Sequence, residues 1–354
     1  MDMRRAPTKV SLLYGLALLL AGAMAGPAVA DNKIAQAPSS PATATAAAPA
    51  INGDGGTIRL VDNPYSTQSY ARIVMQKFQL DKKYGFNLQI IPGGNTAASI
   101  SAIQSGGTDF ALFNWLDLAR MRSAGVNVTG IGPFLQNGAD YFVVPANSPI
   151  KNLGDFKGRK IGIYSRTSIN WVITVAAAQK LYNFDIQKDA FPQEGAANLL
   201  RALLEQGQLD ASHIFNNLTP DLMVTGKFRT MAQIKELVDQ LGLPSTPFLL
   251  WAVDTNYAAA HPGNVKAFLA AYRDAVEILR VDDSAWVEHA KELQMTDKAI
   301  VLLREEMRAD TWSRFAPENE ADIRKTFDLL LAIAGPKVMG VSRLPDGFMT
   351  LEYQ

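Results

Sequence analysis

From residue 57 onward, the hydrophobic pattern of the chain switches repeatedly between the two-residue period of a strand and the helical period of 3.6 residues. The strand-like segments are 58–61, 88–91, 110–113, 160–164, 209–215 and 248–253. The helix-like segments are 70–78, 96–105, 115–124, 167–181, 195–206 and 262–279. This alternation is typical of a largely parallel sheet with crossover helices, so we predict an α/β fold.

The size and composition of the chain favour two lobes. The 354 residues are 48% hydrophobic and 19% charged, which is typical of a globular protein and exceeds what one hydrophobic core usually holds. Beyond residue 253 the pattern is almost wholly helical, and we assign this part a packing role rather than a chemical one.

The first 30 residues have the pattern of a secretory signal peptide. Arg4, Arg5 and Lys9 precede an uncharged apolar run over residues 12–25, and small residues at 28–30 suit a cleavage site. That run is about 15 residues long, whereas a membrane-spanning helix needs about 20. Residues 31–56 are rich in Ala, Pro, Thr, Ser and Gly, so we expect a flexible linker there.

Charge and cysteine content exclude several classes of function. The chain carries 34 basic and 34 acidic residues, so a strong positive field for nucleic acid or an anionic membrane is not expected. It has no cysteine. This excludes disulfides, a cysteine-based zinc site, a cysteine nucleophile and a lipidated cysteine anchor.

A search for catalytic motifs finds no phosphate loop, zinc-protease motif, nucleophile elbow or dinucleotide fingerprint. Ser148 and Lys151 match the S-x-x-K pattern, but a proline between them disfavours the helix that this chemistry needs. His213, His261 and His289 are too far apart in sequence for a local metal site. We therefore expect no catalytic residue, metal or cofactor, and we place His261 and His289 at the surface.

Polar and aromatic residues follow several predicted strands and open the next helices. In an open α/β sheet, ligands bind at the carboxyl ends of strands, beside helix N-termini with free N–H groups. The alternative for each position is ordinary helix capping, which needs the same residue types. The candidate ligand-binding residues are Asn63, Tyr65, Asn95, Asn114, Trp115, Ser165, Arg166, Thr167, Ser168, His213, Phe215 and Asn216.

We assign these candidates different parts of a small ligand. The hydroxyls of Ser165, Thr167 and Ser168 would hold its polar or anionic end at a helix start, and Arg166 would add a charge or remain a solvated loop residue. The aromatic candidates would cover its apolar part, and the asparagines would fix its orientation. His213 is either a ligand contact or a structural histidine.

Three segments carry a resemblance to a known family: AIQSGGTDFA (102–111), LGDFKGRKIGI (153–163) and LLEQGQLDA (203–211). In order and spacing they resemble the periplasmic substrate-binding proteins of ABC importers of the nitrate, sulfonate and taurine type. That family includes binders of thiamine-pyrimidine precursors. The resemblance covers residues 58–293 approximately. The cysteine-rich signature of the family's pyrimidine-synthesising relatives is absent from this sequence. The resemblance therefore gives no support to synthesis of a pyrimidine ring by this protein.

The resemblance implies a two-lobe periplasmic binding protein type II fold, in which each lobe is a mixed, mostly parallel sheet flanked by helices. Lobe 1 would comprise residues 57–143 and 252–354, and lobe 2 residues 144–251, joined by crossover strands near 140–144 and 249–253. The protein would be a monomeric, non-enzymatic periplasmic component that binds a small organic or anionic ligand. Its partners would be permease subunits in the inner membrane with a cytoplasmic ATPase.

Two other classes of function remain open. A periplasmic sensor or accessory protein with the same fold would act on a membrane kinase or a secreted enzyme, and neighbouring genes would separate it from an importer. A secreted enzyme would turn over a bound compound. The family's cleft residues vary with the ligand, so the resemblance does not identify the ligand.

The N-terminal pattern predicts a mature chain that begins at Asp31 after export. Mass spectrometry of the protein released from the periplasm should give the mass of residues 31–354 without a lipid. Recovery of intact residues 1–30 in the membrane fraction would contradict the prediction.

Overall fold

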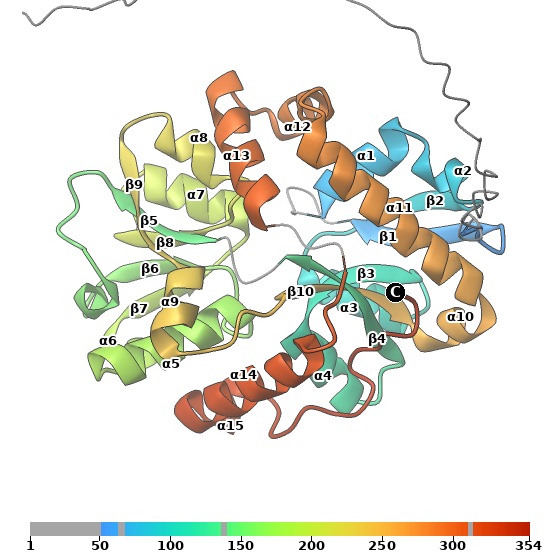
Figure 1. The fold of residues 1–354 in the computed structure, drawn as a ribbon. Helices are drawn as coiled ribbons and strands as arrows, with labels where there is room; N and C mark the ends of the chain where they lie inside the picture. Colours follow the sequence, from blue (N-terminus) through green and yellow to red (C-terminus); the bar gives the residue numbers. More distant parts are fainter. Residues whose placement is uncertain (1–50, 63–67, 136–139, 311–313) are drawn as a thin grey trace, which may run out of the picture. The chain divides into compact units, whose positions relative to one another are not determined.

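The computed structural model describes residues 51–62, 68–135, 140–310 and 314–354, which form two five-stranded sheets with flanking helices (Figure 1). All of them belong to one unit of the chain, Pro49–Gln354. The predicted signal peptide and most of the predicted linker lie outside the described residues. At the end of that linker, the N–H of Gly53 donates to the carbonyl of Tyr84 over 2.7 Å. Among the described helices, none combines the length and the hydropathy needed to span a membrane.

The first sheet has the strand order β2-β1-β3-β10-β4. Its strands are β1 (Thr57–Asp62), β2 (Asn87–Pro92), β3 (Phe110–Asn114), β4 (Val128–Leu135) and β10 (Leu249–Asp254). β1 is parallel to β2 and β3, whereas β10 is antiparallel to β3 and β4. The carboxyl ends of β1, β2 and β3 therefore lie at one edge.

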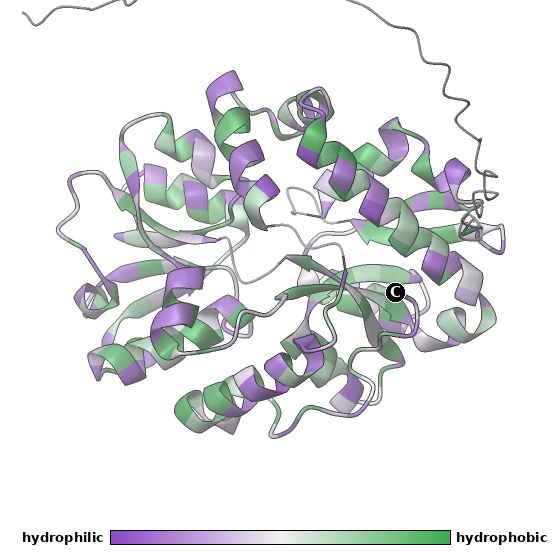
Figure 2. Cartoon of the chain, in the orientation of Figure 1, coloured by the Kyte–Doolittle hydropathy of each residue, from purple (hydrophilic) through white to green (hydrophobic). Residues whose placement is uncertain are grey.

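Side chains of β10 alternate between two hydrophobic cores, one on each face of this sheet. Leu250 and Ala252 join the core that contains residues of α4 (Trp115–Ser123). Trp251 and Val253 join the core that contains residues of α1 (Ser69–Lys77) and α11 (Pro262–Val281). The helices that follow strands of this sheet are α1 (Ser69–Lys77), α2 (Leu80–Lys83), α3 (Thr96–Gln104), α4 (Trp115–Ser123), α10 (Thr255–Ala260), α11 (Pro262–Val281) and α12 (Ala285–Leu293). Hydrophobic and hydrophilic residues alternate along α11 (Figure 2), as expected for a helix with one buried face.

The second sheet has the order β7-β6-β8-β5-β9. Its strands are β5 (Tyr141–Pro145), β6 (Lys160–Ile163), β7 (Phe191–Glu194), β8 (Ala211–Ile214) and β9 (Phe228–Gln233). β6 is parallel to β7 and β8, and β5 is antiparallel to β8 and β9. Its helices are η1 (Leu153–Phe156), α5 (Ile169–Tyr182), α6 (Ile186–Asp189), α7 (Ala197–Glu205), α8 (Thr219–Met223) and α9 (Ile234–Leu241).

The predicted α/β fold with two mixed sheets is confirmed, and the two sheets share one plan. In each, three parallel strands are followed by an antiparallel strand and then an edge strand. Half of the pairings in each sheet are therefore antiparallel, a larger share than the sequence suggested. β4, β7 and β9 were not among the predicted strands.

The three C-terminal helices are α13 (Asp297–Asp310), α14 (Asn319–Ala334) and α15 (Pro336–Met339). They follow the last strand of the first sheet, yet α13 contacts α8 and α14 contacts α5, both of which belong with the second sheet. Phe327 of α14 lies in the same hydrophobic core as Phe113 of β3 and Ile163 of β6. The two sheets therefore share one apolar core.

His289 lies in the interior, not at the surface as predicted from the sequence. Its side chain is fully buried on α12, with ring centroids 5.0 Å from Tyr70 and 5.4 Å from Trp286. Burial, with the nearby charge of Arg72, lowers the pKa of His289 to about 3. The prediction was wrong because this face of α12 packs on α1. His261 is exposed, as predicted.

We expect the stability of the protein to fall in mild acid because two histidines are buried and neutral. Burial lowers the pKa of His213 to about 4 and that of His289 to about 3, whereas the unfolded chain titrates near 6.5. The unfolded state therefore binds more protons below about pH 6.5, and the free energy of unfolding should fall by about 2 kcal/mol per histidine between pH 7.5 and 5. Burial raises the pKa of Asp62 and Asp117. Above about pH 3.8 the folded state therefore binds more protons at these two groups than the unfolded state does, so their contribution to the free energy of unfolding increases as the pH falls.

Urea unfolding at pH 7.5 and 5.0 measures this effect. His289→Phe should remove about half of the acid-induced loss, whereas the exposed control His261→Gln should keep all of it. Equal losses in both variants would show that His289 does not contribute.

Candidate functional site

The predicted site residues lie at the carboxyl ends of strands in both sheets. Asn114 ends β3, Ser165 follows β6 and Phe215 follows β8. Asn63 and Tyr65, predicted to follow β1, lie outside the described residues. The topology therefore places candidates from both sheets at the edges where ligands of α/β proteins bind.

The two sheets meet at the start of α3. The side chain of Asn95 accepts a hydrogen bond from the N–H of Ala98 over 2.9 Å and so caps this helix. The N–H of Thr96 donates to the hydroxyl of Tyr164 over 3.4 Å, and the two hydroxyls lie 3.3 Å apart. Tyr164 follows β6 and packs on Phe215, with ring centroids 5.0 Å apart. Contacts between residues that follow β2, β6 and β8 thus form one cluster.

Asn114 supports the start of α4 rather than pointing a free amide at a ligand. Its side chain accepts from the N–H of Asp117 over 2.9 Å and donates to the carboxylate of Asp117 over 2.6 Å. Arg120 forms an ion pair with Asp117 over 3.1 Å and donates to the carbonyls of Thr167 and Met339. Burial raises the pKa of Asp117 and lowers that of Arg120, and their mutual attraction opposes both shifts. Arg120 thereby ties α4 to the loop before α5.

Trp115 is a core residue in this structure. Its side chain is fully buried, and its ring centroid lies 6.5 Å from that of Phe327 on α14 in an edge-on arrangement. We therefore assign Trp115 a packing role between the sheets.

The hydroxyls of the loop before α5 are largely engaged with each other. The Ser168 hydroxyl donates to the carbonyl of Ser165 over 2.9 Å and accepts from the N–H of Trp171 over 3.2 Å. The hydroxyls of Ser165 and Thr167 lie 2.9 Å apart. Ser168 is thus the N-cap of α5, which is the alternative that the sequence left open for it.

Arg166 is also bound within the protein. Its guanidinium donates to the carbonyl of Pro192 over 2.9 Å and lies 3.5 Å from the carboxylate of Glu194. Its backbone N–H donates to Glu194 over 2.6 Å. An anionic ligand at this loop would compete with Glu194 for the guanidinium.

His213 and Asn216 surround Asp140, which the sequence analysis did not single out. The carboxylate of Asp140 accepts from the Nδ2 amide of Asn170 over 2.7 Å and from the N–H of Asn216 over 3.1 Å. The His213 Nε2 atom lies 3.6 Å from this carboxylate. Burial keeps the pKa of His213 at about 4, so at neutral pH the pair is a neutral ring beside a carboxylate, not a salt bridge.

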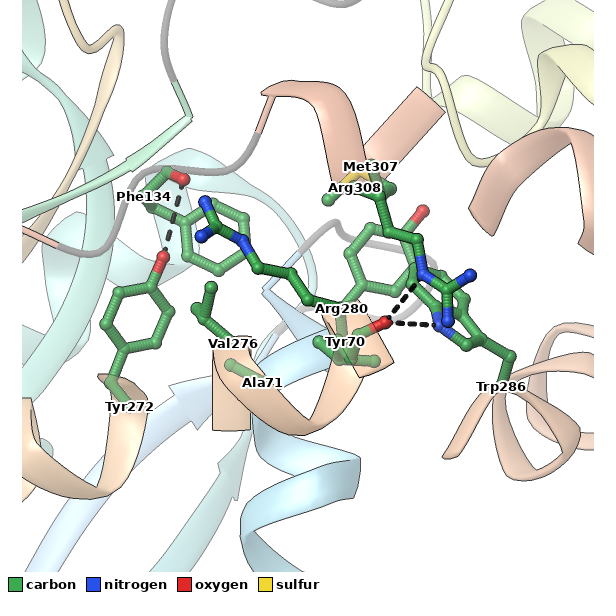
Figure 3. A pocket seen from close by; sticks show the side chains of 10 residues that line it. Tyr70, Ala71, Phe134, Tyr272, Val276, Arg280, Trp286, Met307 and Arg308 are labelled. Carbon is green, nitrogen blue, oxygen red and sulfur yellow. Dashed lines mark hydrogen bonds between the residues drawn. The ribbon is translucent and has the colours of Figure 1, made fainter. Parts of the chain in front are cut away.

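Helices that the sequence analysis assigned to packing also reach this cluster. The side-chain amide of Asn216 donates to the sulfur of Met307 on α13 over 3.0 Å. Met307 and Tyr70 line a cavity of about 10 Å³, large enough for about one water (Figure 3). Burial raises the pKa of Tyr70 well above its usual value, and the charges of Glu306 and Asp140 add to the shift. No local sequence pattern links these residues, because tertiary packing alone brings them together.

The cluster brings together groups of the kinds that hold small ligands. They are the side chains of Asn170 and Asn216, the hydroxyls of Tyr164 and Thr96 and the carboxylate of Asp140. In the described part of the chain, no three His, Asp or Glu side chains come close enough together to hold a metal ion. The arrangement suits recognition of a small polar molecule.

The family model described as NMT1/THI5 like matches residues 82–282 of the chain. This range covers the second sheet with its helices, part of the first sheet and α11. The sequence has no significant match among curated proteins.

Several solved structures share the fold. The alkanesulfonate-binding protein SsuA from Xanthomonas axonopodis pv. citri, bound to MOPS, matches with a TM-score of 0.70 and 16% identity, over 86% of this chain and 99% of that one. The periplasmic aliphatic sulphonate binding protein SsuA from Escherichia coli matches with a TM-score of 0.65 and 19% identity, over 78% and 92%. The desulfurization enzyme DSZB matches with a TM-score of 0.55 and 16% identity, over 83% and 97%. These matches show the periplasmic binding protein fold, and they include one enzyme.

We expect Ser168→Ala to destabilise the protein by about 1 kcal/mol, because it removes the side-chain cap of α5. The sequence alone left both a capping role and a ligand role open for Ser168. Chemical unfolding without ligand measures the change. Ser284→Ala is a matched control, because Ser284 stands at the N-cap of α12 but makes no capping hydrogen bond. Equal stability of the two variants would contradict the capping role.

Proposed function

Because the chain belongs to the NMT1/THI5-like family, we propose that it is the solute-binding component of an ABC importer. It would capture a small organic or anionic ligand and deliver it to a membrane permease. The observation that supports this proposal is the direct contact between the edges of the two sheets at which parallel strands end, the position where ligands of α/β proteins bind. Thr96 reaches Tyr164, and Asn216 reaches Met307, so one molecule at this edge can touch both sheets.

The proposed mechanism is hinge closure of two lobes, residues 57–143 with 252–354 and residues 144–251. The topology of the chain supports it. The chain leaves the first sheet after β4 and returns in β10, so two connections link the sheets. A few residues at such connections can absorb the dihedral changes of a closing motion.

Of the predicted site residues, the proposal retains those that lie in the cluster between the sheets. Phe215 and Asn216 would contact the ligand directly, with His213 beside them. Ser165 and Thr167 would contribute from the loop before α5, and Asn95 from the start of α3. Asn114, Trp115, Arg166 and Ser168 would act through structure, because each is engaged within the protein.

The proposal places the mature protein in the periplasm as a monomer, delivered there by the signal peptide at residues 1–30. Its partners would be the importer's permease subunits and their cytoplasmic ATPase. Support comes from the fold, which the periplasmic sulphonate binder of Escherichia coli shares. A sensor of the same fold would bind its ligand in the same way, and neighbouring genes for a kinase instead of a permease would identify it.

We expect one class of solute to close and stabilise the protein. A thermal-shift screen over sulfonates, nitrate, amidines, pyrimidines and small aromatic acids identifies it. At 100 times its dissociation constant, a true ligand should add about 2.7 kcal/mol to the free energy of unfolding. Small-angle scattering should then show a smaller radius of gyration. Unchanged scattering at saturation would contradict hinge closure.

Phe215→Ala should weaken binding of the ligand found in this screen by about tenfold, since an aromatic contact is worth about 1 kcal/mol beyond the area that it buries. Phe191→Ala is the matched control, because Phe191 is 60% exposed on the edge strand β7. Equal affinity of both variants would place the site elsewhere. Conversion of the bound compound, followed by chromatography, would indicate an enzyme instead.

A further inference from the structure

Arg273 on α11 carries a positive charge whose hydrogen-bonding capacity is only partly used. Its Nη1 atom is buried and has no hydrogen-bond partner. Arginine stays charged in proteins, and a buried charged donor without an acceptor costs free energy. Burial lowers the pKa of Arg273, as expected for a cation taken out of water. An acceptor that reached this nitrogen would therefore be favoured.

The carboxylates closest to Arg273 along α11 are paired with other cations. Asp274, the next residue, forms an ion pair with Lys83 over 2.5 Å. Glu277 stands one turn further, the usual spacing for a helical ion pair, but it pairs with Arg280 over 3.4 Å. The charge of Asp274 still favours the charged form of Arg273. In the described part of the chain, however, no carboxylate lies within ion-pair distance of Arg273.

A second arginine, Arg314, lies close to Arg273. It is exposed in the segment before α14, and its positive charge lowers the pKa of Arg273 further. Among the described residues, Arg314 has no ion pair either. The chain provides a carboxylate for arginines elsewhere, as at Arg59, which lies 2.5 Å from Asp109. Here two like charges stand together instead.

Contacts around the edge strand β4 bring the segments of the two arginines together. Phe315, which directly follows the second arginine, donates its N–H to the side chain of Gln354 over 3.2 Å. The amide of Gln354 donates to a carbonyl of β4. A Cβ atom at Gly132 of β4 would lie 3.8 Å from that amide and 2.7 Å from Leu269, which is one turn before Arg273. The segment before α14 and the middle of α11 therefore meet at this strand.

We propose that Arg273 and Arg314 form a binding site for a small free oxyanion, phosphate or sulfate, separate from the candidate solute site. The anion would supply the acceptor that the buried nitrogen lacks and would offset the repulsion between the two charges. Planar guanidinium groups match the oxygens of such anions. A membrane headgroup is disfavoured, because the anion has to reach a buried atom. Once bound, the anion would tie the segment before α14 to α11.

Thermal unfolding of the full mature chain in Tris chloride, with and without inorganic phosphate at equal ionic strength, tests this site. Saturating phosphate should raise the melting temperature by about 2 °C or more, and sulfate should do the same. Vesicles of phosphatidylglycerol should have no such effect. Arg273→Met keeps the apolar stem and removes the guanidinium, so it should abolish the rise. Arg314→Gln should weaken phosphate binding by about tenfold.

A second measurement separates an anion site from a structural arginine. Without phosphate or sulfate, Arg273→Met should melt no lower than the unmodified protein, because the change removes a partly buried charge and its repulsion by Arg314. A lower melting temperature would show that the charge is compensated within the protein. Arg343→Met is the matched control, because Arg343 is an exposed arginine after α15. This variant should keep the full response to phosphate.

Three results would overturn the inference: no response to phosphate or sulfate, a response that both Arg273→Met and Arg314→Gln keep, or an equal effect of phosphatidylglycerol vesicles. A response that Phe215→Ala removes and Arg273→Met keeps would assign the anion to the candidate solute site instead. If Arg273→Met fails to fold, Arg314→Gln against Arg343→Met decides the result. None of these outcomes bears on the proposed solute-binding function, which the thermal-shift screen and the scattering test separately.

Discussion

The first sheet depends on β10, a strand that comes after all the strands of the second sheet in the sequence. β10 lies between β3 and β4 and is antiparallel to both, so it alone joins β4 to the parallel strands. Its central residue, Trp251, is fully buried, with ring centroids 5.1 Å from Phe268 and 5.4 Å from Phe134 and Tyr272. The chain must therefore cross between the sheets twice. The two connections, and a candidate site beside them, follow from this topology.

Strands with a clear pattern of burial could be predicted from the sequence, and β4 could not. β4 contains Gly130 and Gly132, which lower its strand propensity. Both glycines lie under leucine side chains: a Cβ atom at Gly130 would lie 2.9 Å from Leu250 and one at Gly132 would lie 2.7 Å from Leu269, so each leucine would have to shift to admit a larger residue. The close packing of this strand on its neighbours thus removes the sequence signal that would have revealed it.

The sequence predicted that the candidate site residues lie at strand ends. It did not predict whether each side chain caps a helix or is available for a ligand. Asn114 and Ser168 both cap helices, and capping and ligand binding favour the same residue types. Tyr70 and Met307 gave no signal, since hydrophobic and aromatic residues at helical spacing are usual in cores. They meet the cluster because α12 packs on α1 and α13 packs on α8, and no local pattern specifies these contacts.

Asp140 connects the crossing between the sheets to the candidate site. It directly precedes β5, its carbonyl accepts from the N–H of Ile234 at the start of α9, and its carboxylate holds Asn170 and the backbone of Asn216. Bringing two lobes together around a carboxylate costs desolvation unless a donor replaces the lost water. The amide of Asn170 and the N–H of Asn216 supply such donors, so the segment that crosses between the sheets is held to α5 and to the residues that follow β8.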